Sequence, residues 1–131
     1  MNTGAMVAYI LPSDLASKLS MLAHEAMPDY AEPANALHLT IAYIGEVKDL
    51  TPDQCLRLKA HLSELGARIA PLTGSINGVG RFVDNDPNAV IANVDVRGMT
   101  ELRSSVITVL RMSDVEPVLN HGFTPHITLA Y

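Results

Sequence analysis

The hexapeptide HLTIAY at residues 38–43 returns as HITLAY at residues 126–131, and the two copies differ only by exchanges between Leu and Ile. Both copies have the β-branched and aromatic composition that favours a strand. Side chains alternate between the faces of a strand, so each copy presents its His, Thr and Ala on one face and its aliphatic residues and Tyr on the other. The repeat therefore predicts two strands that each carry an imidazole and a hydroxyl on a common side.

Each copy follows a similar succession of elements. The apolar run at residues 6–11 predicts a buried strand, and Pro12 and Ser13 then offer a stop and an N-cap for a helix that ends near Pro28. In the second half, residues 88–96 alternate as a strand and residues 102–110 show helical spacing, although a β-branched run at residues 106–109 disfavours a helix. Strand, helix and strand thus recur, ending at His38 and at His126.

The middle of the chain predicts another helix, with clear signals at both ends. Thr51 is the expected N-cap, Pro52 the first helical residue, Gln54 the partner in a capping box, and Gly66 the end. Residues 75–83 then predict an irregular strand. The turn formers at residues 84–88 indicate a hairpin into the strand that follows.

Composition favours a single domain over residues 1–131. The chain is 48% hydrophobic, which is enough to bury a core at this length. Apolar stretches end well before the ~18 residues of a membrane span, and no basic and then apolar leader is seen, so we expect a soluble, cytoplasmic protein. The single cysteine, Cys55, excludes an internal disulfide framework and is expected to be a buried core thiol.

Charge and aromatic content limit the class of ligand. Nine Lys and Arg against 14 Asp and Glu leave a net charge of -5, which opposes binding of long nucleic acid through many phosphates. Aromatic residues make up only 5% of the chain and Trp is absent, so an extended platform for stacking bases is not expected. The expected partner is a small nucleotide or a short oligonucleotide, with no long nucleic acid and no membrane.

The repeated His and Thr indicate chemistry rather than packing. Packing explains why both copies hold Leu, Ile, Ala and Tyr, but it gives no reason for His and Thr to return at matched positions. In-line opening of a phosphate ester needs a base, an acid and donors to the phosphate oxygens. We therefore take His38 and His126 as candidate catalytic residues, and Thr40 and Thr128 as candidate phosphate-binding residues.

These motifs resemble those of the 2H phosphoesterase superfamily, also called the 2'-5' RNA ligase-like or cyclic phosphodiesterase group. Residues 37–45 are similar to its first His-x-Thr motif, and residues 123–129 to its second, including the proline before the histidine. The resemblance implies an α+β fold with two pseudo-symmetric lobes of antiparallel sheet packed with helices around a central cleft. It implies cleavage of 2',3'-cyclic phosphates, 2'-5' linkages or cyclic oligonucleotides without metal or cofactor, and favours His126 as base and His38 as acid. The opening residues are similar to those of phage-encoded members.

Four further residues are candidates for substrate binding. Arg81 and Phe82 follow a glycine-rich strand, where the arginine would bind phosphate and the phenylalanine would stack on a base or pack at the rim of the core. Tyr9 lies on the first strand, and His121 lies in a loop five residues before His126. His24 and His61 are on predicted helices, where solvated or capping roles are favoured.

The leading hypothesis is a metal-independent phosphodiesterase that acts on a cyclic phosphate or a 2'-5' linked nucleotide. Its rival is a non-catalytic module that binds or sequesters a nucleotide, as a domain of a phage structural protein would. A nucleotide ligase is less favoured, because neither an adenylation lysine motif nor an ATP loop is visible in the sequence. A histidine metal site lacks a third ligand beside either motif. We expect a monomer.

Overall fold

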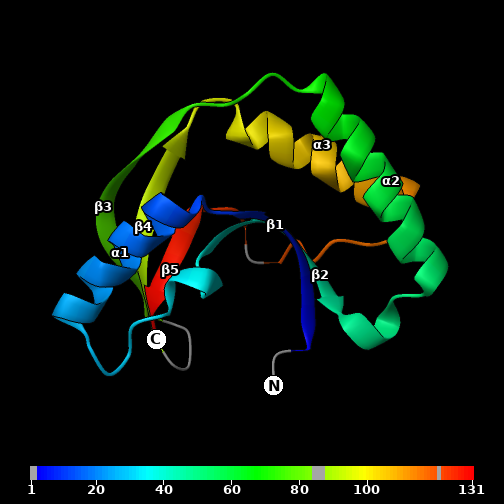
Figure 1. Cartoon of the computed structure of the whole chain (residues 1–131). Coiled ribbons are helices and arrows are strands. Elements are labelled where there is room, and N and C mark those ends of the chain that lie inside the picture. The colour runs from blue at the N-terminus through cyan, green and yellow to red at the C-terminus, as the bar shows by residue number, and fades with distance from the viewer. Residues whose placement is uncertain (1–2, 84–87, 121) are drawn as a thin grey trace. The chain divides into compact units, whose positions relative to one another are not determined.

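The computed structural model describes residues 3–83, 88–120 and 122–131. These residues form an α+β structure, which confirms the predicted fold class (Figure 1). In chain order its main elements are β1 (Gly4–Ile10), α1 (Ser13–Ala26), β2 (His38–Glu46), α2 (Pro52–Arg68), β3 (Gly74–Phe82), β4 (Ala89–Val96), α3 (Met99–Met112) and β5 (His126–Ala130). Short 3₁₀ turns, η1 (Ala34–Ala36) and η2 (Val47–Asp49), lie on either side of β2.

The described strands form one five-stranded sheet in the order β1-β2-β5-β4-β3. The strand β5 therefore lies between β2 and β4, and it is antiparallel to both. The two copies of the repeat consequently occupy adjacent strands, although 88 positions separate their histidines in the sequence (126 − 38). Both predicted successions of strand, helix and strand are present, but β1 contains no buried residue, so the prediction of a buried first strand was wrong.

Helix α1 begins at Ser13, the residue expected to be its N-cap, and so one residue earlier than predicted. Pro12 occupies the N-cap position with φ -55° and ψ 143°, no side chain caps the helix, and Ser13 is already helical. The prediction of Ser13 as N-cap was therefore wrong. The physical reason is that proline already holds the extended conformation an N-cap needs, so the turn can start at the next residue. The helix ends at Ala26, as Pro28 predicted.

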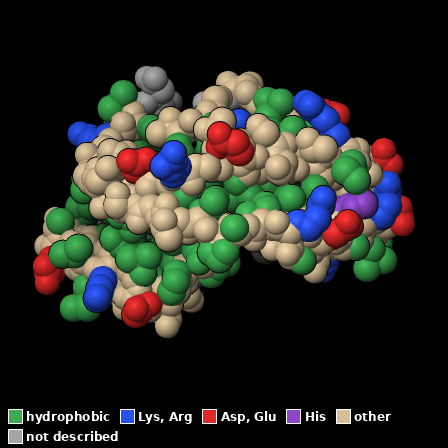
Figure 2. All heavy atoms as spheres, turned by 90° about the horizontal axis from the view of Figure 1, so that it is seen from above, with side chains coloured by type: hydrophobic (Ala, Val, Ile, Leu, Met, Phe, Trp, Pro, Cys, Tyr) green, Lys and Arg blue, Asp and Glu red, His purple; other side chains and the backbone are tan. Residues whose placement is uncertain are grey.

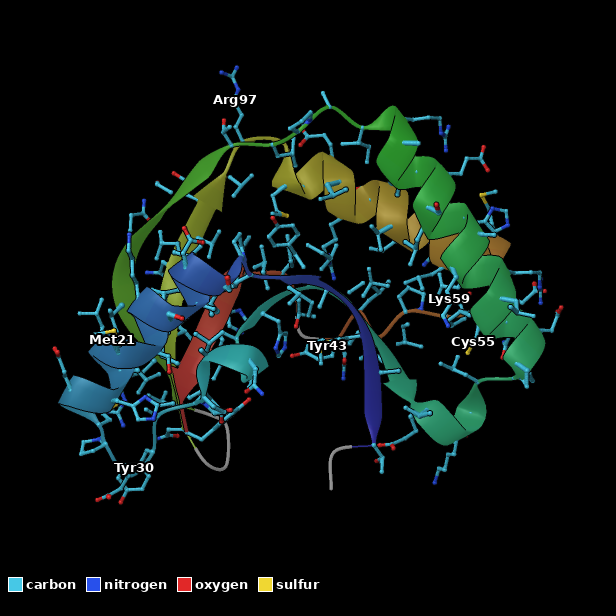
Figure 3. The ribbon with its side chains drawn as sticks, in the orientation of Figure 1. Met21, Tyr30, Tyr43, Cys55, Lys59 and Arg97 are labelled. Carbon is cyan, nitrogen blue, oxygen red and sulfur yellow. The ribbon has the colours of Figure 1, made fainter. Side chains whose placement is uncertain are left out.

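Helix α2 has the predicted capping box. The Gln54 backbone N–H donates to Thr51 Oγ1 at 3.1 Å, and the Thr51 N–H donates to Gln54 Oε1 at 2.8 Å. The helix continues two residues past Gly66 and ends at Arg68, so the predicted stop was early. Cys55 lies on this helix one turn before Lys59 (Figure 3) and is half-buried, which corrects the expectation of a fully buried thiol.

Helix α3 forms despite its β-branched run. Val106, Val109 and Leu110 are all buried, and this burial outweighs the weak helix propensity of the segment. Gly98 precedes the helix with φ 89°, a left-handed conformation that suits glycine. Most of the predicted turn between β3 and β4, residues 84–87, lies outside the described residues.

The chain forms two compact units. Unit 1 comprises Met1–Val7, Ile41–Thr73 and Val96–Phe123, and unit 2 comprises Ala8–Thr40, Gly74–Asp95 and Thr124–Tyr131. Each unit draws on three separate segments of the chain, so neither corresponds to one half of the sequence. Both His-x-Thr motifs belong to unit 2. None of the described helices is long and apolar enough to cross a membrane.

In unit 1, α2 packs against α3. The Gln54 amide donates to the Asp114 carbonyl oxygen at 2.7 Å, and the Arg57 guanidinium donates to the carboxylates of Asp53 and Asp114. The hydrogen bond to Asp114, with the charges of both carboxylates, raises the pKa of Arg57. These contacts join the start of α2 to the segment that follows α3.

In unit 2, α1 packs against β5 (Figure 1). The buried residues of the helix are Ala16, Ser20 and Ala23, and such small side chains permit close approach of helix and sheet. The Ser20 hydroxyl donates to the Glu32 carbonyl oxygen at 3.0 Å. Ile127 at the centre of β5 is only 1% exposed, so the apolar positions of the repeat form part of the core.

Candidate active site

The register between β2 and β5 brings the two motifs together. Leu39 is the partner of Ile127 in this antiparallel pair. One step along the ladder in each direction places His38 opposite Thr128 and Thr40 opposite His126. Residues directly opposite each other project from the same face of a sheet. Both histidines and both threonines therefore share one face of unit 2.

Burial follows the predicted alternation over the first four residues of each copy, but Ala42 and Ala130 are buried and Tyr43 and Tyr131 are exposed, which departs from it. Leu39, Ile41, Ile127 and Leu129 are buried, whereas the His and Thr of each motif are half-buried. The aliphatic positions therefore anchor the two strands in the core. The imidazoles and hydroxyls remain accessible on the other face.

Both imidazoles make the same hydrogen bond to the backbone. His38 Nδ1 lies 2.8 Å from the carbonyl oxygen of Ala36, and His126 Nδ1 lies 2.6 Å from the carbonyl oxygen of Thr124. In each case the acceptor belongs to the residue two positions before the histidine. A carbonyl oxygen can only accept, so each Nδ1 carries the proton and donates it. A neutral ring held in this way presents the lone pair of Nε2 to a ligand.

Phe82 touches one of the two histidines. The Phe82 and His126 ring centroids are 4.8 Å apart, and the planes meet at 89°, so the contact is edge to face. Phe82 ends β3, the strand beyond β4 in the sheet. Of the four additional candidates from sequence, it is the one that the described contacts join to a motif.

The other three candidates are not joined to the motifs in this way. Alternation along β3 directs Arg81 to the face opposite Phe82, and its side chain is exposed. Tyr9 lies on β1 and is 56% exposed. His121 lies outside the described residues. Roles for these three in substrate binding stay predictions.

Sequence reasoning missed Asn93 as a site residue. The β4–β5 register pairs Asn93 with His126 and Ile91 with Thr128, so Asn93 projects from the face that carries the motifs. The available signal was a single amide in a strand whose other residues are apolar except Asp95. The neighbour across the ladder could not be read from the sequence.

Comparisons with known proteins agree with this arrangement. The family model described as the 2'-5' RNA ligase superfamily matches residues 12–131. A search of curated proteins finds no match. Solved structures with the same fold include TT0787 of Thermus thermophilus, E. coli LigT in its apo form, and the MHV ns2 PDE domain.

The structural agreement extends over nearly the whole chain. TT0787 is 23% identical, with a TM-score of 0.75 over 97% of this chain and 73% of that one. LigT is 22% identical, with a TM-score of 0.68 over 98% of this chain and 71% of that one. The MHV domain is 19% identical, with a TM-score of 0.62 over 98% of this chain and 83% of that one.

At these identities the solved structures establish the fold, and the family assignment rests on the sequence match. That match covers both His-x-Thr motifs and all but the first strand. The chain therefore belongs to the 2'-5' RNA ligase superfamily.

Proposed function

We propose that this protein hydrolyses a 2',3'-cyclic phosphate, a 2'-5' linkage or a cyclic oligonucleotide by two-histidine acid and base catalysis, with His38 and His126 as the catalytic residues. The observation that carries the proposal is the matched pair of Nδ1 hydrogen bonds to Ala36 and Thr124. The β2–β5 register supports a common sheet face for both imidazoles, and a ring that donates through Nδ1 has Nε2 available to take or give a proton.

The reaction on a cyclic phosphate needs the two imidazoles in different protonation states. The neutral imidazole accepts a proton from water while the water oxygen forms a bond to phosphorus. The bond from phosphorus to one ribose oxygen breaks, and the protonated imidazole donates its Nε2 proton to that oxygen. Thr40 and Thr128 donate hydroxyl hydrogen bonds to the non-bridging oxygens as negative charge grows there.

The proposed ligand is a small nucleotide or a short oligonucleotide. The net charge of -5 supports this size, because a long phosphate chain would be repelled. On the face drawn in Figure 2, Lys and Arg side chains stand singly or beside Asp and Glu, without forming a continuous basic band. E. coli LigT has been solved with 3'-AMP, with ATP and with NADP+, which supports a nucleotide ligand here by analogy.

The test is a turnover screen in the presence of a chelator. Substrates are the four nucleoside 2',3'-cyclic phosphates, 2'-5' oligoadenylate and cyclic dinucleotides. Activity on at least one of these is expected, with loss in His38→Ala and in His126→Ala. His61→Ala is the matched control, because His61 lies on α2 in unit 1, away from either motif in the sequence. Binding of nucleotides without turnover would identify a non-catalytic module instead.

A further inference from the structure

Asn93 is a direct cross-strand neighbour of His126. The two residues are partners in the β4–β5 ladder, and the Val94 N–H donates to the Pro125 carbonyl oxygen at 3.3 Å. In an antiparallel ladder, hydrogen-bonded and non-hydrogen-bonded pairs alternate. The bond between Val94 and Pro125 therefore makes the adjacent Asn93–His126 pair a non-hydrogen-bonded one, in which side chains approach most closely. The two Cβ atoms are therefore about 5 Å apart. A ligand group beside His126 also lies beside the Asn93 amide.

The strand on the other side of Asn93 leaves the amide uncovered. A methyl group placed on Gly80 would lie 3.8 Å from Asn93 Oδ1, and one placed on Gly78 would lie 3.7 Å from Asn93 Nδ2. Both glycines therefore face the amide but carry no side chain over it. Two residues after Gly80, Phe82 contacts His126. Along this face of β3, Gly78 and Gly80 therefore expose bare backbone, and Phe82 at the next alternate position presents an aromatic ring.

No hydrogen bond to the Asn93 side chain is found among the described residues, although the residue is half-buried. A primary amide has two N–H donors and a carbonyl acceptor, and groups of this kind in a folded protein bond to protein, water or ligand. The structure therefore presents an amide next to the candidate catalytic face with its hydrogen-bonding capacity available.

We infer that Asn93 determines base specificity by hydrogen-bonding the edge of a nucleobase that lies over Gly78 and Gly80. This inference rests on the proposed function, which puts the phosphate between β2 and β5. Neighbouring strands are about 4.8 Å apart. The base position between β4 and β3 is therefore about 10 Å from the phosphate position between β2 and β5, which leaves room for the ribose between base and phosphate.

The chemistry of the amide favours a base over a phosphate at this position. A neutral amide pairs a donor with an acceptor, which matches the edge of a nucleobase, whereas phosphate is bound best by cations and by several N–H groups. A flat ring also fits against peptide backbone that has no side chains. Recognition of unstacked bases in this manner, by edge contacts and flat surfaces, is usual for single nucleotides.

The first test compares kcat/KM for the four nucleoside 2',3'-cyclic phosphates. The wild type is expected to discriminate among bases by roughly 10-fold to 100-fold, the effect of a good amide-to-base contact. Asn93→Ala should bring the four kcat/KM values close together. The change should arise from KM, and kcat for the poorest substrate should change little. Asn93→Asp, which removes the donors but keeps the shape, should change the order of preference. Asn77→Ala is the control, since Asn77 is exposed on β3 and alternates to the opposite face.

A second variant tests the bare surface while keeping the Asn93 amide. Gly80→Ala has room for its methyl group, whose nearest contact would be Ile91 Cγ1 at 3.6 Å, so folding should be retained. The methyl group would lie where the base is placed, so KM should rise about as much for favoured as for disfavoured bases. Gly66→Ala on α2 is the matched control, because nothing lies within 4 Å of that position. Gly78 is unsuitable, since its φ of +107° would strain alanine.

Calorimetric binding of the four nucleoside 3'-monophosphates separates this inference from the proposed function. Base-dependent binding that Asn93→Ala abolishes, without turnover of any substrate, would support Asn93 and reject the phosphodiesterase proposal. Turnover with equal kcat/KM for all four bases, or a preference that survives Asn93→Ala, would reject Asn93 and leave the proposed function standing. Absence of both turnover and nucleotide binding would overturn both.

Discussion

Leu39 pairs with Ile127 across the antiparallel β2–β5 ladder, and this one register sets each histidine opposite the threonine of the other motif. The side-chain period of a strand is two, so a slip by one residue would turn one motif toward the core and expose its aliphatic residues. Burial of Leu39 and Ile127, at 6% and 1% exposure, opposes such a slip. The geometry of the candidate active site is therefore coupled to the packing of the core.

Replacement of either histidine should abolish most activity. His38→Ala and His126→Ala are each expected to lower kcat/KM by ~10²-fold to 10⁴-fold, the range for a positioned proton-transfer group. Thermal unfolding should stay close to that of the wild type, because both imidazoles are half-buried and their hydrogen bonds to the described residues run from Nδ1 to backbone. Unaltered turnover in the double variant would contradict a catalytic role for both residues.

The threonines should have smaller effects than the histidines. Thr40→Val and Thr128→Val remove one hydroxyl donor each while preserving the β-branched shape, and a loss of about 10-fold to 10³-fold in kcat is expected. Thr→Ser at the same positions keeps the hydroxyl and should retain much of the activity. If serine and valine variants were equally impaired, the hydroxyl would not be the important group.

Acid and base catalysis by two histidines predicts a bell-shaped pH profile. Histidine is the side chain that ordinarily titrates between about pH 5 and pH 8. The rate should rise with pH as the base loses its proton and fall as the acid loses its own, which gives the profile two limbs. EDTA should leave kcat unchanged. Activity lost with EDTA and restored by a divalent ion would refute the metal-independent mechanism.

The capping box of α2 supplies a prediction about stability alone. Thr51→Ala removes the acceptor of the Gln54 N–H and should lower the free energy of unfolding by about 1 kcal/mol. Urea denaturation measures this change, and kcat should be unaffected because Thr51 belongs to unit 1. Thr100→Ala, at an exposed position of α3, is the control and should change stability by less than about 0.5 kcal/mol.

Ligand size can be tested by salt dependence. If affinity rests on one or two phosphates, the logarithm of the binding constant should fall with the logarithm of salt concentration with a slope of about 1 to 2 in magnitude. A short oligonucleotide with a terminal cyclic phosphate is the suitable probe, in a variant lacking His38 and His126. A steep slope on long RNA would show that the substrate class is wrong.

Much of the fold was predictable because its signals are local. Hydrophobic period, Pro28 and the capping box around Thr51 depend only on neighbouring residues, and each predicted helix and strand is present. Errors arose where two local signals competed. Pro12 displaced Ser13 as the N-cap of α1, and helix α2 continued through Gly66 for two further residues.

Prediction of the site was limited because contacts between residues on different strands cannot be inferred from a single stretch of sequence. The repeat identified the four motif residues and alternation gave their common face, because both properties lie within one strand. The contact between Phe82 and His126 and the pairing of Asn93 with His126 depend on strand order and register. Register is the sum of many burial preferences, and no short stretch of sequence contains it.

The backbone acceptors at residues 36 and 124 also bear on how this protein tolerates mutation. In many enzymes a carboxylate side chain orients the catalytic imidazole, and a single substitution can remove it. Here the orienting atoms belong to the peptide chain, so replacing Ala36 or Thr124 by another residue that keeps the backbone conformation leaves both acceptors in place. Selection can therefore vary the side chains beside each histidine, and with them the shape presented to the substrate, without altering which ring nitrogen carries the proton.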